Sequence, residues 1–119
     1  MDDIMLQDKI YKELSNFNFS RNSISFQYLI LAIYLVSKDK NQIKNFRNGI
    51  YKKIAETYNT KPENVMWGIN KIIKMMYLNT NEKIIKDYFE LYETREPSTK
   101  EFIIFISYKV TRNISYMVY

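Results

Sequence analysis

Five polar or aromatic residues between positions 64 and 74 share one side of a predicted helix. They are Asn64, Trp67, Asn70, Lys71 and Lys74. At about 100° per residue, their positions fall within about 120° of one another around the helix axis. The amide of an asparagine pairs with adenine through two hydrogen bonds, and a lysine ammonium is a flexible positive charge suited to phosphates. This face therefore has the chemistry to contact the bases and the backbone of a nucleic acid.

The same residues also have ordinary structural interpretations. Trp67 stands opposite the apolar stripe of its helix, so it contacts DNA, another protein or a neighbouring helix of its own fold. Lys71 and Lys74 are either phosphate contacts or solvated lysines. Asn64 and Asn70 beside them favour the DNA-binding interpretation.

Catalysis and metal binding have few residues to draw on, because the chain contains neither cysteine nor histidine. This composition removes disulfides, thiolate nucleophiles, histidine bases and nearly all zinc sites. The carboxylate pairs lie near a terminus or in a loop, and the sequence has no glycine-rich phosphate cradle. We therefore expect no enzyme, no metal, no cofactor and no small-molecule substrate.

The positive charge is concentrated in the middle of the chain, whose overall net charge is +5. Residues 38–74 hold nine basic and three acidic side chains, whereas the segments before and after them are nearly balanced, at −1 and 0. A clustered surplus is typical of a protein that binds a polyanion, although basic stretches also serve solubility alone. Lys53 and Lys61 belong to this segment and complete the predicted DNA-binding residues.

The elements that must position these side chains are helices. Two glycines and two prolines in 119 residues are too few for the frequent turns of a β-sandwich or barrel. The chain length and the 46% hydrophobic content suit one core, so we predict an all-α fold, a compact bundle of about six helices, with residues 1–119 as a single domain. Apolar periodicity places the helices at about 3–17, 23–40, 41–58, 61–79, 82–92 and from 98 onwards, with Gly49 as a candidate break in the third.

Helix boundaries and core faces follow from local patterns. Ser23 is expected to cap the second helix, Asn79–Asn81 to separate the fourth from the fifth, and Pro62 to occupy a first turn. Thr60 with Glu63 and Ser98 with Glu101 have the spacing of capping boxes. The residues expected to face the core include Ile4, Tyr11, Val65, Ile69, Ile72, Met76, Ile84, Ile85, Tyr88 and Tyr92.

Residues from about 50 to 79 predict a helix-turn-helix, because a short helix, a turn of about three residues and a longer amphipathic helix follow one another. In this motif the second helix enters the major groove. Any two consecutive helices of a bundle would present the same pattern. Periodicity alone therefore does not distinguish a DNA-binding helix-turn-helix from an ordinary pair of neighbouring helices.

Several short segments occur in a characteristic order along the chain: Phe26–Leu29, Ala32–Ile33, Ile54–Thr60, Val65, Ile69 and Glu96–Ile103. They resemble the C-terminal DNA-binding effector domain of the sporulation response regulator Spo0A. The resemblance spans about residues 23–112 and implies a six-helix fold with a helix-turn-helix that binds short DNA boxes, often as head-to-tail pairs.

The chain departs from this family in two respects. The family protein normally carries an N-terminal receiver domain, whereas only about twenty residues precede the similar region here, so we expect no phosphorylation control within this chain. The family's reading helix is rich in arginine, with a glutamate and a histidine. The matching positions here are Asn64, Met66, Trp67, Asn70, Lys71 and Lys74, which predict a different DNA target.

The sequence thus predicts a transcriptional regulator that binds double-stranded DNA, alone or with itself or a related regulator. The alternative is a protein-interaction module or antagonist that keeps the fold and pairs with another regulator through Trp67 and Leu78. Met1–Asp3 lacks the basic start of a secretory signal, and the apolar run Phe26–Val36 is shorter than the roughly twenty residues that span a bilayer. We therefore expect a cytoplasmic location, at the nucleoid when bound, and no membrane partner.

Overall fold

The structure, a computed structural model, describes residues 3–90 and 96–118, with side chains as far as residue 112. Tyr92, the part of the predicted connection at residues 94–95 and the side chains of the tyrosine-rich end lie outside this description. Within the described ranges the protein has six α-helices and no strand, which confirms the predicted all-α class. The helices are α1 (Asp3–Leu14), α2 (Ile24–Lys38), α3 (Lys52–Thr57), α4 (Pro62–Asn79), α5 (Glu82–Tyr88) and α6 (Thr99–Val118).

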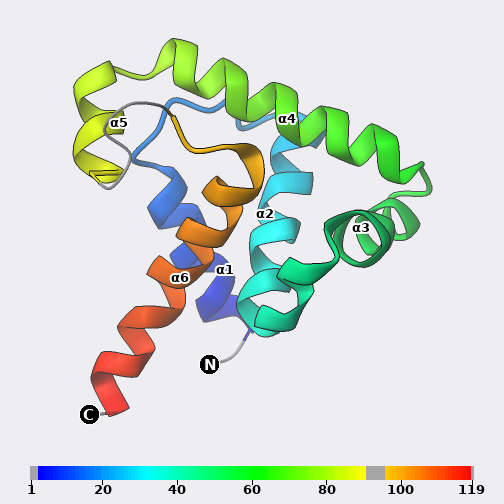
Figure 1. The fold of residues 1–119 in the computed structure, drawn as a ribbon, viewed down its shortest axis with the longest axis horizontal. Coiled ribbons are helices and arrows are strands. Elements are labelled where there is room, and N and C mark those ends of the chain that lie inside the picture. The colour runs from blue at the N-terminus through cyan, green and yellow to red at the C-terminus, as the bar shows by residue number, and fades with distance from the viewer. Residues whose placement is uncertain (1–2, 91–95, 119) are drawn as a thin grey trace.

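The central element is α2, against which α1, α4 and α6 all pack (Figure 1). Its start is fixed locally, as the sequence predicts, because the Ser23 hydroxyl accepts a hydrogen bond from the Phe26 N–H at 3.2 Å. Leu29, Ala32, Ile33 and Val36 are fully buried along it. An α2 that is apolar on most sides is what a helix surrounded by other helices requires.

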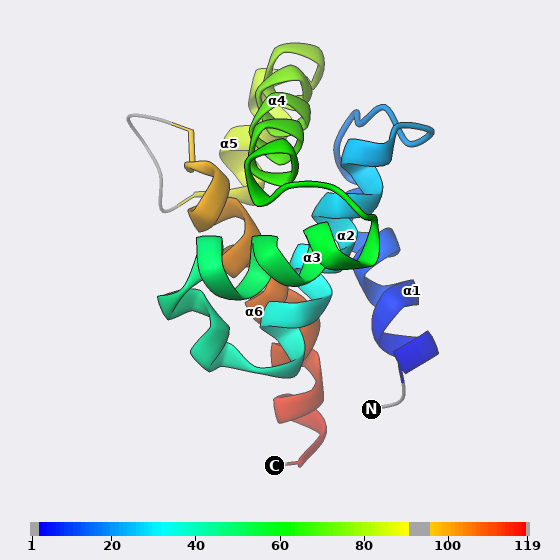
Figure 2. The same ribbon diagram turned by 90° about the vertical axis from the view of Figure 1, so that its right-hand side faces the viewer.

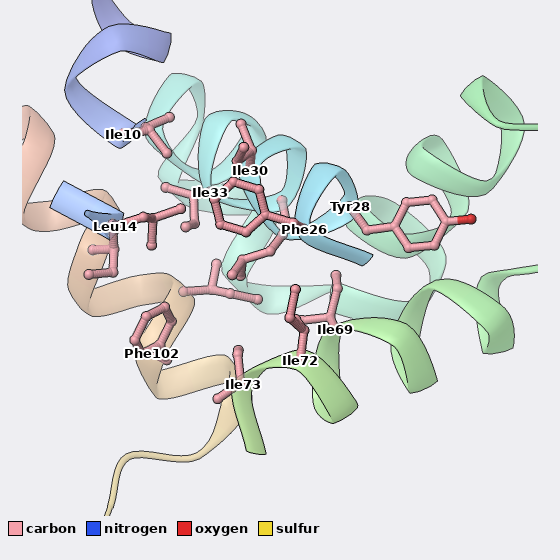
Figure 3. Packing of buried hydrophobic residues seen from close by; sticks show 14 of the residues in the cluster. Ile10, Leu14, Phe26, Tyr28, Ile30, Ile33, Ile69, Ile72, Ile73 and Phe102 are labelled. Atoms are coloured by element: carbon pink, nitrogen blue, oxygen red, sulfur yellow. The ribbon is translucent and has the colours of Figure 1, made fainter. Parts of the chain in front are cut away.

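The core is built from side chains that several helices direct toward α2 (Figure 3). Ile10 and Leu14 come from α1, Ile69 and Ile73 from α4, and Phe102 from α6. All five are at most 2% exposed. The buried side of α4, which is Val65, Ile69, Ile72, Ile73 and Met76, includes the whole apolar stripe that its periodicity predicts.

Two features hold α4 against α2: a close contact between Gly68 and Ser25, and hydrogen bonds from the loop between α1 and α2 to the end of α4. A Cβ built on Gly68 would lie 2.7 Å from the Ser25 hydroxyl oxygen, so the missing side chain permits the approach. Near the end of α4, the Asn18 N–H donates to the Thr80 hydroxyl at 2.9 Å, and the Asn18 amide donates to the Asn79 carbonyl at 3.1 Å. Figure 2 shows α4 nearly end-on, above the rest of the bundle.

The start of α4 differs from the prediction. Thr60 and Glu63 form no capping box, because Lys61 is the N-cap residue and makes no side-chain capping bond. The Thr60 hydroxyl instead accepts a hydrogen bond from the Asn64 amide at 2.9 Å, and Glu63 forms an ion pair with Arg47. Pro62 does occupy the first turn, as expected. The box expected at Ser98 and Glu101 is confirmed, since each residue's side chain accepts the other's N–H, at 3.2 and 2.9 Å.

The segment expected as one helix over residues 41–58 is divided into three parts. A 3₁₀ turn (Lys40–Lys44) is followed by a π-helical turn (Phe46–Tyr51) and by α3. The break falls at Asn45, not at Gly49, because the Asn45 backbone is non-helical and its side chain caps the π-helical turn by accepting the Asn48 N–H at 3.3 Å.

The end of the first helix and the burial of three residues also differ from the prediction. The first helix ends at Leu14, where Ser15 and Asn16 bond back to the last turn, although Phe17 is buried. Ile4, Tyr11 and Ile84 were expected to face the core, yet they are 74%, 41% and 45% exposed.

Within the described residues, none of the helices is both long enough and apolar enough to cross a bilayer.

Candidate nucleic-acid interface

The turn that joins α3 to α4 has a defined geometry. Asn59 adopts a left-handed backbone conformation with φ of 53°. The N–H groups of Thr60 and Asn59 donate to the carbonyls of Ala55 and Glu56, at 2.9 and 3.4 Å. This pattern is a Schellman motif, which ends α3 and reverses the chain into α4, with asparagine as one of the few non-glycine residues that tolerate the conformation. A short helix, a tight turn and a long helix therefore lie where the sequence predicts them.

The side of α4 opposite the core is open to solvent. Trp67 is 62% exposed, and Asn70, Lys71 and Lys74 are exposed around it. We call these four residues the α4 outer face. From Trp67 to Lys74 this face extends over about two turns of the helix. Trp67 is therefore not part of the buried core, and its contact with DNA or another protein stays a prediction.

The remaining predicted residues lie around the start of α4. Lys53 on α3 and Lys61 at the N-cap are exposed. Asn64 is exposed too, but its amide nitrogen donates to the Thr60 hydroxyl, so it supports the start of α4 as well as bordering the outer face. All seven predicted residues therefore lie within or directly beside the helix-turn-helix, and each is reachable from solvent.

One acidic residue stands in α4, and its charge is matched. Glu63 in the first turn pairs with Arg47, which comes from the π-helical turn. The positive charge of Arg47 offsets the negative charge of Glu63 at the N-terminal end of α4, where Lys61 is the N-cap residue. The electrostatic character of the outer face is consequently set by Lys71 and Lys74.

Sequence reasoning missed a hollow that adjoins Asn70. Its volume is about 430 Å³, and it lies between α4, the π-helical turn and the first residues of α6. Arg47 and Lys100 contribute cationic side chains to its wall, and the Lys100 ammonium lies over the Phe46 ring, 5.5 Å from its centre. Burial raises the pKa of Tyr51, also in the wall, to about 12, so its hydroxyl stays neutral. No sequence pattern brings residues 47, 70 and 100 together.

Beyond the outer face, the second half of α4 exposes large apolar side chains. Leu78 is 72% exposed and Met75 is 47% exposed. Leu78 lies eleven residues after Trp67, about three helical turns and about 16 Å farther along the axis. Lys71 and Lys74 lie one helical turn before Met75 and Leu78, respectively, on the same side of the helix.

Residues 10–110 match the protein family described as sporulation initiation factor Spo0A, C terminal. The domain of that family is the DNA-binding effector domain of a sporulation regulator. The matched range includes α2, α3, α4 and α5 together with parts of α1 and α6. The comparison with curated proteins gave no match. The resemblance noted from the sequence segments is thus confirmed over most of the chain.

Proposed function

This chain belongs to the family of Spo0A C-terminal domains, and from that membership we propose that it is a transcriptional regulator that binds double-stranded DNA through α4. In a helix-turn-helix the second helix lies in the major groove while the first crosses the backbone. By this rule α4 enters the groove and α3 lies across the phosphates. Because the residues of the outer face differ from the arginine-rich reading helix of the family, we propose that this protein prefers a different DNA sequence.

One observation carries this proposal: the α4 outer face is open and cationic. Trp67, Lys71 and Lys74 leave the helix on the side opposite its buried stripe. A major groove about 12 Å wide admits one α-helix with its side chains. Since the buried stripe holds α4 on the bundle, only the outer face is available to such a groove.

The residue types assign separate roles along the outer face. Asn70 is suited to adenine, whose edge offers one donor and one acceptor to an amide. Trp67 is suited to apolar contact with thymine methyl groups. Lys71 and Lys74 are suited to phosphates, and Lys53 and Lys61 extend those contacts toward α3. Because α4 contains no arginine, we propose a target richer in A·T pairs than an arginine-rich reading helix would select.

The test combines a charge reversal with the protein's single tryptophan. Lys71→Glu with Lys74→Glu should remove most binding to a mixed-sequence duplex, and wild-type Trp67 fluorescence should change when the duplex is added. The matched control is Lys12→Glu with Lys86→Glu, which changes the net charge equally on exposed residues of α1 and α5. Equal binding by the two double variants would reject the assignment of this face.

The alternative function, a module that binds another regulator, rests on the exposure of Leu78 and Trp67. An apolar pair of this kind suits a protein partner more than a phosphate backbone. Leu78→Ala should then abolish partner binding while leaving DNA binding unchanged. A Trp67 fluorescence response to a related regulator but never to a duplex would favour this alternative.

We further propose that the chain acts as one domain, because a single buried cluster joins α1 through α6. A protein whose ligand is chromosomal DNA works in the cytoplasm at the nucleoid. A second copy or a related regulator is the proposed neighbour on adjacent DNA sites. Selection of bound duplexes from a random library would show whether single, tandem or inverted sites are preferred.

A further inference from the structure

The further inference concerns the surfaces on either side of α4, and it rests on the proposed binding of α4 in a major groove. An α-helix with its side chains is about 10–12 Å across, close to the width of the groove. Elements that directly border such a helix therefore meet the two sugar–phosphate strands that border the groove. The chemistry of these elements decides how the helix is held in register.

The first bordering element is the segment of residues 18–25, which we call the Arg21 flank. It is tied to the end of α4 by the two hydrogen bonds that Asn18 donates to Asn79 and Thr80. Its other end meets the middle of α4, where the Ser25 hydroxyl lies so near to Gly68 that a Cβ there would be 2.7 Å from it. Figure 1 shows this blue segment running alongside α4. Arg21 is exposed on it, and residues 18–25 contain no acidic side chain.

The second bordering element is formed by Lys100 and Arg47, which we call the Lys100 flank. Both side chains line the hollow beside Asn70, on the side of α4 that faces away from Gly68. The start of α6 is held there by α4 itself, because the Tyr77 hydroxyl donates to the Pro97 carbonyl at 2.9 Å. Contact with the Phe46 ring orients the Lys100 ammonium.

Two acidic residues beside the Lys100 flank form contacts within the protein. Glu63 pairs with Arg47, and Glu101 accepts the Ser98 N–H in the capping box. The capping box satisfies the N–H groups of Ser98 and Glu101, and the charged group that the start of α6 offers to an anion is the Lys100 ammonium. The guanidinium of Arg47 has further N–H donors beyond those used by Glu63.

We propose that the two flanks clamp the opposite phosphate strands of the groove that α4 occupies, with Arg21 on one strand and Lys100 together with Arg47 on the other. These contacts carry no sequence information. They fix the register of α4, so that Asn70 and Trp67 meet defined base edges. Arg21 and Lys100 lie outside residues 38–74 and are therefore invisible in the charge distribution along the chain.

The experiment is a salt titration of binding to a fluorescein-labelled duplex of mixed sequence, between about 50 and 200 mM salt. Each phosphate contact contributes about 0.9 to the slope of log affinity against log salt. Arg21→Gln and Lys100→Gln should each lower the slope by about 0.9, and the double variant by about 1.8. Wild-type affinity should fall about three- to fourfold more across this range than that of either single variant.

Three control variants make the result specific. Arg21→Lys and Lys100→Arg keep the charge and should keep the wild-type slope. Lys12→Gln removes an exposed charge on α1 and should leave the slope unchanged. Matching circular dichroism spectra and melting curves would show that the variants are folded, as expected for exposed positions.

The outcomes separate the two proposals. If Arg21→Gln and Lys100→Gln leave the slope unchanged while Lys71→Gln lowers it, the clamp is wrong and DNA binding by α4 stands. If only one flank variant changes the slope, a clamp on both strands is likewise overturned. If the wild-type protein binds no duplex even at the lowest salt, the proposed function fails together with the clamp.

Discussion

The two sides of α4 have opposite compositions and opposite surroundings. The inner side presents Val65, Ile69 and Ile73 to the core, and all are at most 2% exposed. The outer face presents Trp67, Lys71 and others to solvent. Packing free energy comes from apolar area removed from water, whereas binding free energy comes from groups still available to a ligand. One helix therefore holds both the anchor of the fold and the proposed binding surface, and substitutions should affect one without the other.

The largest effect should come from the inner side. Ile69→Ala should lower the free energy of unfolding by about 2–5 kcal/mol, because a fully buried side chain is replaced by a cavity. Urea denaturation followed by far-ultraviolet circular dichroism measures the change. Lys74→Ala, one to two turns away on the outer face, should change the same quantity by less than about 0.5 kcal/mol. Similar losses in the two variants would contradict the separation of the two sides.

The next effect tests the outer face. Asn70→Ala should reduce discrimination in favour of adenine at one position by about 1–3 kcal/mol, because a bidentate contact is lost. Competition between selected and single-substituted duplexes measures it. Lys71→Ala should weaken binding to all of these duplexes about equally, since a phosphate contact carries no base information. If Lys71→Ala lost discrimination between the duplexes and Asn70→Ala kept it, Lys71 would be the base contact and Asn70 would not.

The turn at Asn59 orients α4, and with it both the buried side and the outer face of this helix. Asn59→Ala should lower the free energy of unfolding by about 1 kcal/mol, because alanine disfavours the left-handed conformation at φ of 53°. Asn59→Gly should cause no such loss, since glycine adopts this conformation freely. Thermal unfolding of the two variants provides the comparison. Equal destabilisation would mean that the asparagine side chain, and not the backbone, stabilises the turn.

The smallest effect concerns Trp67. Replacing a contacted thymine by deoxyuridine removes one methyl group and keeps the base pair, so affinity should fall about fourfold, or about 0.8 kcal/mol. The Trp67→Ala variant should bind the two duplexes equally well. Fluorescence anisotropy with paired duplexes measures both. A loss that persists in Trp67→Ala would assign the methyl contact to another residue.

Local patterns in the sequence predicted much of this architecture. Ser23 and the Ser98–Glu101 box fix helix starts through bonds that span three residues. The buried stripe of α4 follows from apolar residues at helical spacing. Such features depend on neighbours within about four positions, so a linear reading of the chain finds them.

The expectations that were wrong involve competition from distant residues. Glu63 has the spacing of a capping box, but Arg47, sixteen positions earlier, lies close enough to pair with it. Ile84 fits an apolar periodicity, yet α5 turns Ile85 and Phe89 into the core and leaves Ile84 exposed. These partners lie on other elements of the fold, and only the packing of the helices shows which of them are present.

The proposed binding surface divides in the same way. The sequence by itself determined that Trp67, Asn70, Lys71 and Lys74 share a helix side, because helical periodicity fixes angles within one element. Only the tertiary structure brought Lys100 and Arg47 beside Asn70 and laid residues 18–25 along α4. Positions that are far apart in the chain become neighbours through the packing of whole helices around α2, and no spacing rule encodes that arrangement.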